Sequence, residues 1–441
     1  MTTPATGADP RPTPDDVALI RSPAFWVTVR YAVLFGVVLA FAALAFLGLV
    51  TFGTKLWFTL PADLGWFGGS PWWVAVTAGA GLLVGLLRRF LRLPEKVPGT
   101  VEEMRVGRVE PSTVLGAVAV SLVSLSGGAS LGPEDALAKL GGGLGTWTSE
   151  RRSLDDGQRV TNTLSGMSAA YGGLLSSPIL ASILTLEIGR PTAVRLADTV
   201  VGGLLAASVA FAVYFPIAGS TFIGIYTLPP YTFEDWHMLA AIPLGLAAGA
   251  LALITIIAVA LMKRFTAPLA KFTVLRPVIG GIVFGLVGVA LPLTLFTGTD
   301  QLTTVIDQAA ALGAGLLIAI VVAKIFVFAV CEATGFIGGP FLVMLFIGGT
   351  AGMTVNLLFP GLPAGLTFTA MFAALPAALV PAPFSLILLG ALTTQIGTLQ
   401  IAPVAIAVLT SYLAVSGSGV LVALARRQSR PQSDGSADQS R

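Results

Sequence analysis

Long runs of apolar residues, interrupted by glycine and proline, make up most of this chain. An α-helix needs about 20 apolar residues to cross a bilayer. Several uncharged runs reach that length: Tyr31 to Val50, Ser112 to Pro133, Thr161 to Leu186, His237 to Met262 and Pro277 to Thr299. Pro71 to Leu86 is shorter, and prolines divide the uncharged stretch from Ala333 to Ala425. The pattern predicts an all-α integral membrane protein with tilted and broken helices rather than an orderly bundle.

One loop-to-helix segment occurs twice. It reads G-A-S-L-G-P-E from Gly128 to Glu134 and G-F-I-G-G-P-F from Gly335 to Phe341, 207 residues later. A pair of glycines follows each copy at the same spacing, at Gly141-Gly142 and at Gly348-Gly349. Glycine and proline that break apolar segments at corresponding places are typical of transporters with internal repeats.

A second match follows each copy roughly forty residues further on. Ser177-Pro178-Ile179 opens an apolar run in one place, and Ala382-Pro383-Phe384 opens one in the other. The order of the matches predicts one transmembrane domain over residues 23–425, with a first half of about 23–217 and a second half of about 237–425.

Composition supports the same class. Hydrophobic residues make up 55% of the chain, charged residues 11%, and the mean hydropathy is +0.88. Soluble domains contain about 25% charged residues. The net charge of +3 does not indicate nucleic acid, because the basic residues lie at the edges of apolar runs. They are Arg88, Arg89, Arg92, Lys96, Arg105 and Arg108, then Lys263, Arg264, Lys271 and Arg276, and finally Arg426 and Arg427.

By the positive-inside rule these basic connections are cytoplasmic. The segment 218–236 has acidic residues and no Lys or Arg, which fits the outer side. Residues 1–22 are too hydrophilic for a cleaved signal, and together with 426–441 they are expected to be disordered cytoplasmic tails. We therefore expect a multi-pass protein of the cell membrane with both termini in the cytoplasm.

The sequence lacks the residues that enzyme catalysis would require. Gly128 to Gly132 matches the G-x-S-x-G pattern of hydrolases, which requires a base beside Ser130 and a strand-to-helix turn. The single histidine, His237, lies at the edge of an apolar run, and the single cysteine, Cys331, excludes an intrachain disulfide. A metal site built on histidines is excluded as well.

Each copy of the repeated segment predicts a helix start at membrane depth, since proline favours the first helical position. Free N–H groups and a partial positive charge make a helix start attractive to anions, so two starts brought together would form an anion cradle. Glu134 opens the first helix, whereas Phe341 takes its place in the second. The acid either complements its own helix dipole or, as carboxylates at membrane depth usually do, has a function.

These residues resemble the CLC family of chloride channels and chloride/proton antiporters. The segment 132–136 is similar to the family's gate segment, 339–343 to its G-x-F-x-P segment, and 177–187 to its A-P-x-x-G-I-L-F-x-x-E stretch. The resemblance covers about residues 30–427 and includes no C-terminal regulatory domain. It implies a CLC-type fold of two inverted-topology halves, a homodimer in the lipid bilayer with one pathway per subunit, and no cofactor. Chloride or another small monovalent anion would be transported.

The resemblance also assigns residues. Glu134 would be the gating glutamate, which occupies an anion site until it is displaced or protonated. The implied anion-binding residues are Pro98, Gly99, Thr100, Gly132, Pro133, Gly339, Phe341 and Leu342. Pro98 stands where the family has a serine, Pro340 offers no N–H, and the family's tyrosine aligns roughly with Val420. Thr100 is the substitute hydroxyl. Fewer donors predict weaker anion binding, since each hydrogen bond to a charged group contributes about 1.5–3 kcal/mol.

Proton coupling depends on one position. Ile188 aligns with the glutamate that relays protons in the family's antiporters, and an aliphatic side chain carries no proton. We therefore expect channel-like or uncoupled anion movement. A register shift by one residue would make Glu187 the relay and give an anion/proton antiporter; a transport-inactive structural homologue is the other alternative.

Two lysines in apolar surroundings need partners. Asp135 is the expected partner of Lys139, one helical turn away. Lys324 is expected either to pair with Glu332 or to line a cavity wall.

Overall fold

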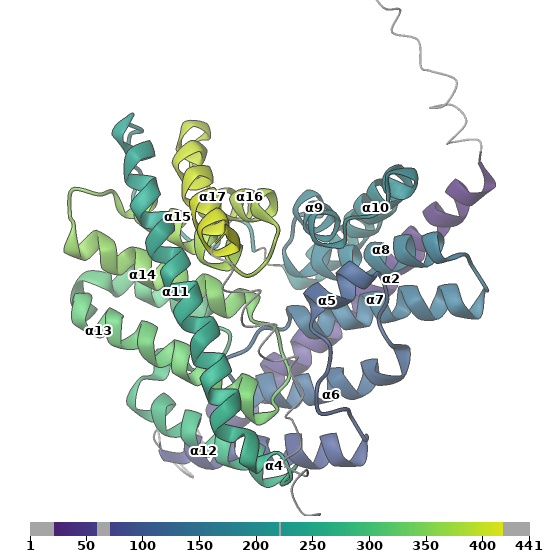
Figure 1. The fold of residues 1–441 in the computed structure, drawn as a ribbon, viewed down its shortest axis with the longest axis horizontal. Coiled ribbons are helices and arrows are strands. Elements are labelled where there is room, and N and C mark those ends of the chain that lie inside the picture. Colours follow the sequence, from purple (N-terminus) through teal and green to yellow (C-terminus); the bar gives the residue numbers. More distant parts are fainter. Residues whose placement is uncertain (1–21, 60–70, 220–221, 418–441) are drawn as a thin grey trace, which may run out of the picture. The chain divides into compact units, whose positions relative to one another are not determined.

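The computed structural model describes residues 22–59, 71–219 and 222–417. Helices make up this part of the chain (Figure 1), and its sole β feature is an isolated bridge between Gly132 and Gly339. The all-α prediction is confirmed. The expected tails lie outside the described residues, apart from Ser22. The helices are α2 (Pro23–Thr54), α4 (Pro71–Phe90), α5 (Thr100–Val106), α6 (Pro111–Ser126), α7 (Glu134–Arg151), α8 (Asp156–Leu174), α9 (Pro178–Gly189), α10 (Ala193–Ala218), α11 (Trp236–Thr266), α12 (Leu275–Ala290), α13 (Thr299–Thr334), α14 (Phe341–Leu358), α15 (Ala364–Ala377), α16 (Pro383–Thr394) and α17 (Ile401–Gly417), with short 3₁₀ or π turns between some of them.

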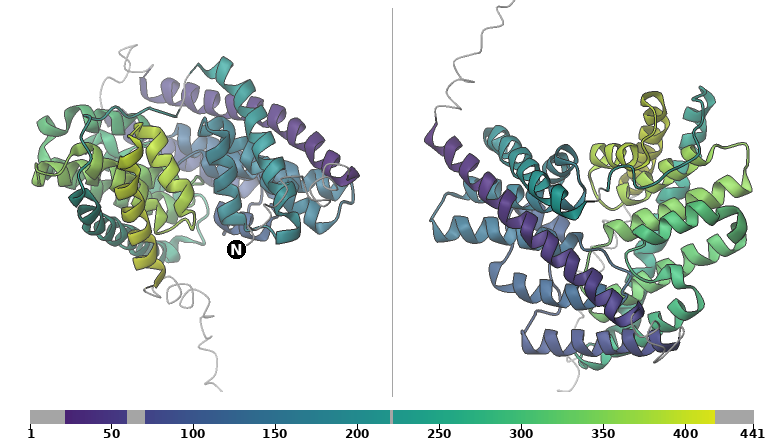
Figure 2. Two further views of the ribbon diagram at one scale, coloured as in Figure 1. Left: turned by 90° about the horizontal axis from the view of Figure 1, so that it is seen from above. Right: turned by 180° about the vertical axis from the view of Figure 1, so that it is seen from behind.

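Seven helical segments of the described chain are long and apolar enough to cross a membrane. They include α2, which is one long helix in the right-hand view of Figure 2, and also α4 and α11, which contain predicted runs. The spans in α10 and α13 were missed. Charged residues such as Asp307 and Lys324 interrupt the uncharged runs of α13, whereas in α10 the charges lie only in the first turns, at Arg195 and Asp198.

Three predicted spanning runs are wrong as single helices. The run from Ser112 ends with α6 at Ser126, the run from Thr161 is divided between α8 and α9, and the run from Pro277 ends with α12 at Ala290. Residues with positive φ stop the helices near these breaks, at Gly128 (φ +85°), Ser176 (+54°) and Phe296 (+58°). Apolar composition continues through each break, so hydropathy does not reveal it.

The chain forms two compact units. One comprises Met1–Leu44, Glu102–Val114 and Leu137–Ser220, and the other comprises Ala45–Val101, Leu115–Ala136 and Thr221–Arg441. Both copies of the repeated loop belong to the second unit. The compact units therefore do not coincide with the two halves of the sequence repeat.

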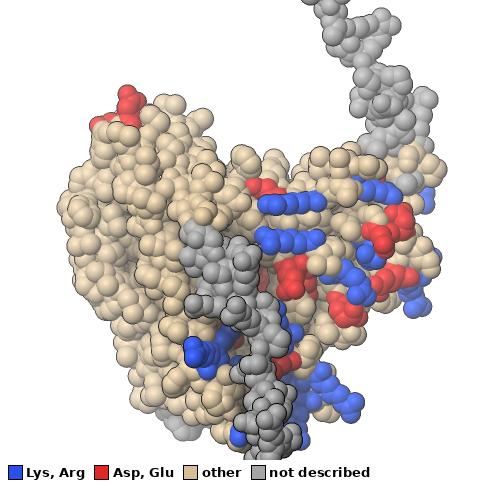
Figure 3. All heavy atoms as spheres, in the orientation of Figure 1, with Lys and Arg blue, Asp and Glu red and all other residues tan. Residues whose placement is uncertain are grey.

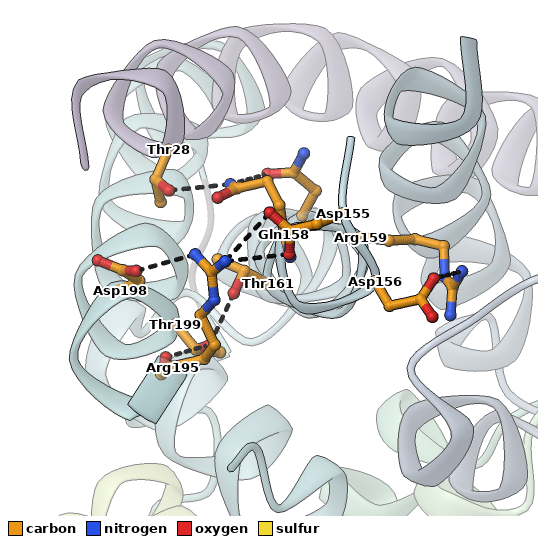
Figure 4. A network of polar contacts seen from close by, with 10 residues as sticks. Thr28, Asp155, Asp156, Gln158, Arg159, Thr161, Arg195, Asp198 and Thr199 are labelled. Atoms are coloured by element: carbon orange, nitrogen blue, oxygen red, sulfur yellow. Dashed lines mark hydrogen bonds and ion pairs between the residues drawn. The ribbon is translucent and has the colours of Figure 1, made fainter. Parts of the chain in front are cut away.

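In the first unit, α2 packs on α8 and α10 through Ala32, Phe35, Leu39, Ala40, Ala169, Ala206 and Ala210. A polar network lies among the same helices (Figure 4). Arg195 of α10 donates to both carboxylate oxygens of Asp155, at 3.0 and 3.1 Å, and Gln158 donates to Thr28. Asp155 caps α8 by accepting the amide of Gln158, and this bond, aided by the Arg195 guanidinium, lowers the pKa of Asp155. The network fixes where α8 begins.

The sequence repeat recurs in how helices pack. A Cβ placed on Gly141 of α7 would lie 2.2 Å from the carbonyl oxygen of Gly166 on α8. A Cβ on Gly348 of α14 would lie 2.4 Å from that of Met371 on α15. In each half, therefore, the helix after the repeated loop packs through glycine directly on the backbone of the next helix.

Charge is distributed unevenly over the surface. In the view of Figure 3, Lys, Arg, Asp and Glu side chains gather over the α7–α10 region, while the surface over α13–α17 carries almost none. A surface with so few charges is suited to contact with lipid.

Candidate functional site

The two copies of the repeated loop bind each other. Gly132 and Gly339 exchange both backbone hydrogen bonds, each with an N···O distance of 2.7 Å. These residues correspond to each other in the repeat, 207 positions apart. Gly128 and Gly335, the next corresponding pair, both have positive φ, +85° and +100°, which glycine adopts without strain. The repeat thus brings the two loops together, as the sequence predicted.

A second pair of contacts has the same symmetry. The amide of Ile337 donates to Ser124 Oγ at 3.2 Å, and the amide of Ser130 hydrogen-bonds the sulfur of Cys331. Ser124 corresponds to Cys331, and Ser130 to Ile337, at the same 207-residue offset. Local two-fold symmetry therefore relates the loops and the helices that precede them.

Glu134 lies where the two copies meet. It is the first residue of α7 and is 5% exposed. Its Oε1 accepts the amide of Phe341 at 2.7 Å and that of Leu342 at 3.3 Å, at the start of α14. The carboxylate of one copy thus occupies the helix start of the other, where a small anion would bind.

Glycines leave room for this carboxylate. A Cβ on Gly132 would lie 1.8 Å from Glu134 Oε2, and a Cβ on Gly339 would lie 2.2 Å from Oε1. Within the described residues, no Lys or Arg forms an ion pair with Glu134. Backbone amides are the donors that hold it.

The remaining predicted residues lie on both sides of these loops. Pro133 is buried directly before Glu134, and Pro340, without an N–H, is the N-cap of α14. Pro98 and Gly99 are exposed in the loop before α5. Thr100 opens α5, and its hydroxyl donates to Asp135 Oδ1 at 2.5 Å. The structure links Thr100 to the residue after Glu134, which the sequence did not predict. Val420 lies outside the described residues.

Ile188 and Glu187 lie together in the last turn of α9. Ile188 is 3% exposed and Glu187 is half-buried. The aliphatic side chain is thus in the protein interior.

The two buried lysines have different kinds of partner. Lys139 forms a buried ion pair with Glu103 at 2.9 Å. The pairing of Lys324 with Glu332 is wrong, because Glu332 pairs with Lys263 at 3.1 Å and Lys324 binds backbone carbonyls. Eight helical positions separate Lys324 from Glu332, which is about 12 Å along the axis and too far for a salt bridge.

The site has backbone donors to bind an anion. Ser130 is fully buried, and its hydroxyl has no hydrogen-bond partner in the described chain. Across residues 22–59, 71–219 and 222–417 no cluster of His, Cys, Asp and Glu could hold a metal ion.

Comparison with known families agrees with this geometry. The family model described as "Voltage gated chloride channel" matches residues 79–416, well over half of the chain. The chain belongs to the CLC family. Its fold class, recognised from the repeated loop, is thereby confirmed, and the protein is a multi-pass membrane protein of CLC-type anion transport.

Curated relatives and solved CLC structures cover most of the chain. "Putative ion-transport protein YfeO" of Escherichia fergusonii is 26% identical over 314 residues, 69% of this chain and 72% of that protein. The protein of the same name from Escherichia coli O7:K1 is 28% identical over 312 residues, 68% and 72% of the two chains. Both relatives carry a name for ion transport.

Solved structures share the fold. A slow cyanobacterial Cl⁻/H⁺ antiporter superposes with a TM-score of 0.79 at 19% identity, covering 92% of this chain and 98% of that one. A CLC-type fluoride/proton antiporter gives 0.72 at 18% identity with the same coverage. A eukaryotic CLC transporter gives 0.73 at 16% identity, covering 92% and 75%.

Proposed function

We propose that this CLC protein moves a small monovalent anion, chloride in the first place, along a pathway that the Glu134 carboxylate gates. The observation that carries the proposal is the position of Oε1 on the amides of Phe341 and Leu342. A negatively charged oxygen there competes with the anion for the same donors. Movement of the carboxylate away, or its protonation, frees the site.

Anion efflux from liposomes that contain the pure protein tests the gate. Replacing Glu134 by Gln or Ala is expected to raise efflux about tenfold or more, because the competing charge is lost, which corresponds to a barrier about 1.4 kcal/mol lower. In the wild-type protein, protonation of Glu134 is expected to raise efflux at acid pH. This increase is expected to disappear in both variants, since no carboxylate remains to be protonated.

Glu187→Gln is the matched control, since it removes a half-buried acid at a different helix and is expected to leave the pH profile of efflux in place. Efflux by Glu134→Ala with the wild-type rate and pH profile would show that the gate is elsewhere. No efflux by any variant would favour a transport-inactive homologue.

The proposal includes movement without obligatory proton exchange. It is supported by Ile188, which aligns in the sequence with the relay acid of the family's antiporters, is buried in this chain and cannot bind a proton. Because two structural neighbours are described as proton antiporters, the competing proposal is an anion/proton antiporter that uses Glu187.

A homodimer with one pathway per subunit, and cytoplasmic termini, complete the proposal. Basic residues at the ends of α4 and α11, Arg88, Arg89, Lys263 and Arg264, support this orientation by the positive-inside rule. Light scattering on the detergent-solubilised protein measures the oligomeric state.

A further inference from the structure

Lys324 is a buried cation that the gate mechanism leaves unused. Its side chain is fully buried in α13, and Nζ donates to the carbonyl oxygens of Thr294, Leu295 and Phe296 at 3.2, 3.1 and 2.7 Å. Three acceptors match the three N–H donors of an ammonium group. Among the described residues, no Asp or Glu forms an ion pair with it. Lysines are seldom fully buried without a counter-charge.

The turn that Lys324 holds supports the gate loop. Phe296, the nearest acceptor, donates its own amide to the carbonyl of Gly128 at 3.1 Å, and Thr297 Oγ1 donates to the carbonyl of Leu131, also at 3.1 Å. Phe296 has φ +58°, an unfavourable conformation for a bulky residue, which persists only where surrounding contacts impose it. The ammonium supplies such a contact.

Lys324 also reaches the other partner of the gate. Nζ lies 4.7 Å from the centre of the Phe346 ring, on the α14 helix whose first amides bind Glu134. This distance is typical of a cation–π contact. One ammonium group therefore connects the loop that carries the gating carboxylate with the helix that receives it.

Lys324 occurs in only one half of the internal repeat. The position that corresponds to Lys324 in the first half is Ala117, which is buried in α6. The loop after α6 nevertheless has the same backbone turn as the loop after α13, with positive φ at Gly128 and at Gly335. At the loop after α13 the buried Arg88 donates to the carbonyl of Gly335 at 3.1 Å, so a different cation contacts that loop. The other buried lysine, Lys139, has the Glu103 carboxylate as its partner.

We propose that Lys324 is a positioning residue of the anion pathway: it holds the two sides of the gate in register, and its charge, balanced only by carbonyl dipoles, favours an anion in the pathway. In a poorly screened interior a charge without a counter-ion acts over longer distances than at a surface. The inference rests on the proposed gating role of Glu134.

Chloride efflux in the Glu134→Ala background tests this, since no gating carboxylate then competes with the anion. Lys324→Met is expected to raise the chloride concentration for half-maximal efflux about tenfold above that of the Glu134→Ala parent. Lys324→Arg keeps the charge and is expected to give the parent's value. Lys263→Met, at a half-exposed lysine on α11, is the matched control and is expected to behave as its parent.

Size-exclusion chromatography identifies variants that do not fold. If Lys324→Met is not monodisperse, Lys324→Gln replaces it, because glutamine removes the charge and keeps two of the three donors. Unchanged chloride dependence in a folded Lys324→Met or Lys324→Gln would overturn the proposal. This outcome differs from the one that would contradict the gating role of Glu134. In that case Glu134→Ala itself would not alter efflux.

Discussion

Glu134 and Asp135 are neighbours on α7, yet their carboxylates have different partners. Glu134 binds the amides at the start of α14, and Asp135 accepts the hydroxyl of Thr100. Thr100 has the only side-chain hydroxyl of the segment from Val97 to Val101, where the CLC family supplies a hydroxyl to the anion. In this arrangement the hydroxyl is directed to an acid of the protein itself.

Removal of Asp135 is therefore expected to strengthen anion binding. Asp135→Ala frees the Thr100 hydroxyl and removes a negative charge, and one hydrogen bond to an anion contributes about 1.5–3 kcal/mol, or about tenfold or more in affinity. Chloride titration by isothermal calorimetry measures the change. In the double variant with Thr100→Val, the part of the gain that the hydroxyl provides is expected to disappear. Equal gains with and without Thr100 would mean that the hydroxyl does not contribute.

At the residue scale, the sequence predicted the helix starts at Glu134 and Phe341, but not the partners of Thr100 and Lys324. Glu134 was recognisable because proline, glycine and one acid recur in a local pattern. Thr100 and Asp135 are 35 positions apart, and Lys324 binds carbonyls about 30 positions away. Such contacts follow from how helices pack, which no local pattern encodes.

Among the elements, the loop between α6 and α7 and its counterpart between α13 and α14 have the greatest influence on the site. They pair through Gly132 and Gly339, and neither glycine leaves space for a side chain beside the Glu134 carboxylate. The elements themselves were predicted where Pro178 and Pro383 open helices, and both prolines occupy the first helical turn. The helix start at Pro178 was thus predicted, but the end of α12 at Ala290 was not, because the loop that follows it is as apolar as the helix.

Gly132→Ala is expected to displace the gate. Its Cβ would lie 1.8 Å from Glu134 Oε2, so the carboxylate must leave the amides of Phe341 and Leu342. Efflux should then approach that of Glu134→Ala, with a lower midpoint of thermal unfolding.

Gly79→Ala on α4 is the control, since its Cβ would meet no atom within 4 Å. A Gly132→Ala protein with wild-type efflux and pH dependence would indicate that the carboxylate does not need this position to close the pathway.

Across the whole molecule, symmetry is clear in the contacts and broken in the charges. Gly81 approaches the carbonyl of Pro277, and Gly281 approaches that of Thr77, as expected for α4 and α12 related by a two-fold axis. Lys324, Glu134 and Asp135 have no counterpart of like charge in the other half. The duplicated backbone provides two facing loops. Charged residues that occur in only one half make the loops different: one carries the Glu134 carboxylate, and the other leads to the amides that bind it.

Proton coupling is a property of the whole transporter, and it requires a continuous set of groups that bind protons between the gate and the cytoplasm. We propose that Ile188 interrupts that set, because the register anchored on Pro178 aligns it with the relay acid, and α9 is continuous from Pro178 to Gly189. Insertion of an acid at the bilayer centre costs about 2.5–3.5 kcal/mol, so an unused relay acid is readily lost. We therefore expect an imposed chloride gradient to move chloride without uphill proton movement.

A pH-sensitive dye inside the liposomes, read together with a chloride electrode, measures both fluxes. Wild-type protein and Glu187→Gln are expected to give the same chloride flux and no sustained proton flux. Uphill proton movement at a fixed chloride-to-proton ratio, abolished by Glu187→Gln, would instead establish an antiporter with Glu187 as its relay. Proton movement that survives Glu187→Gln would place the relay on neither residue and would equally end the uncoupled interpretation.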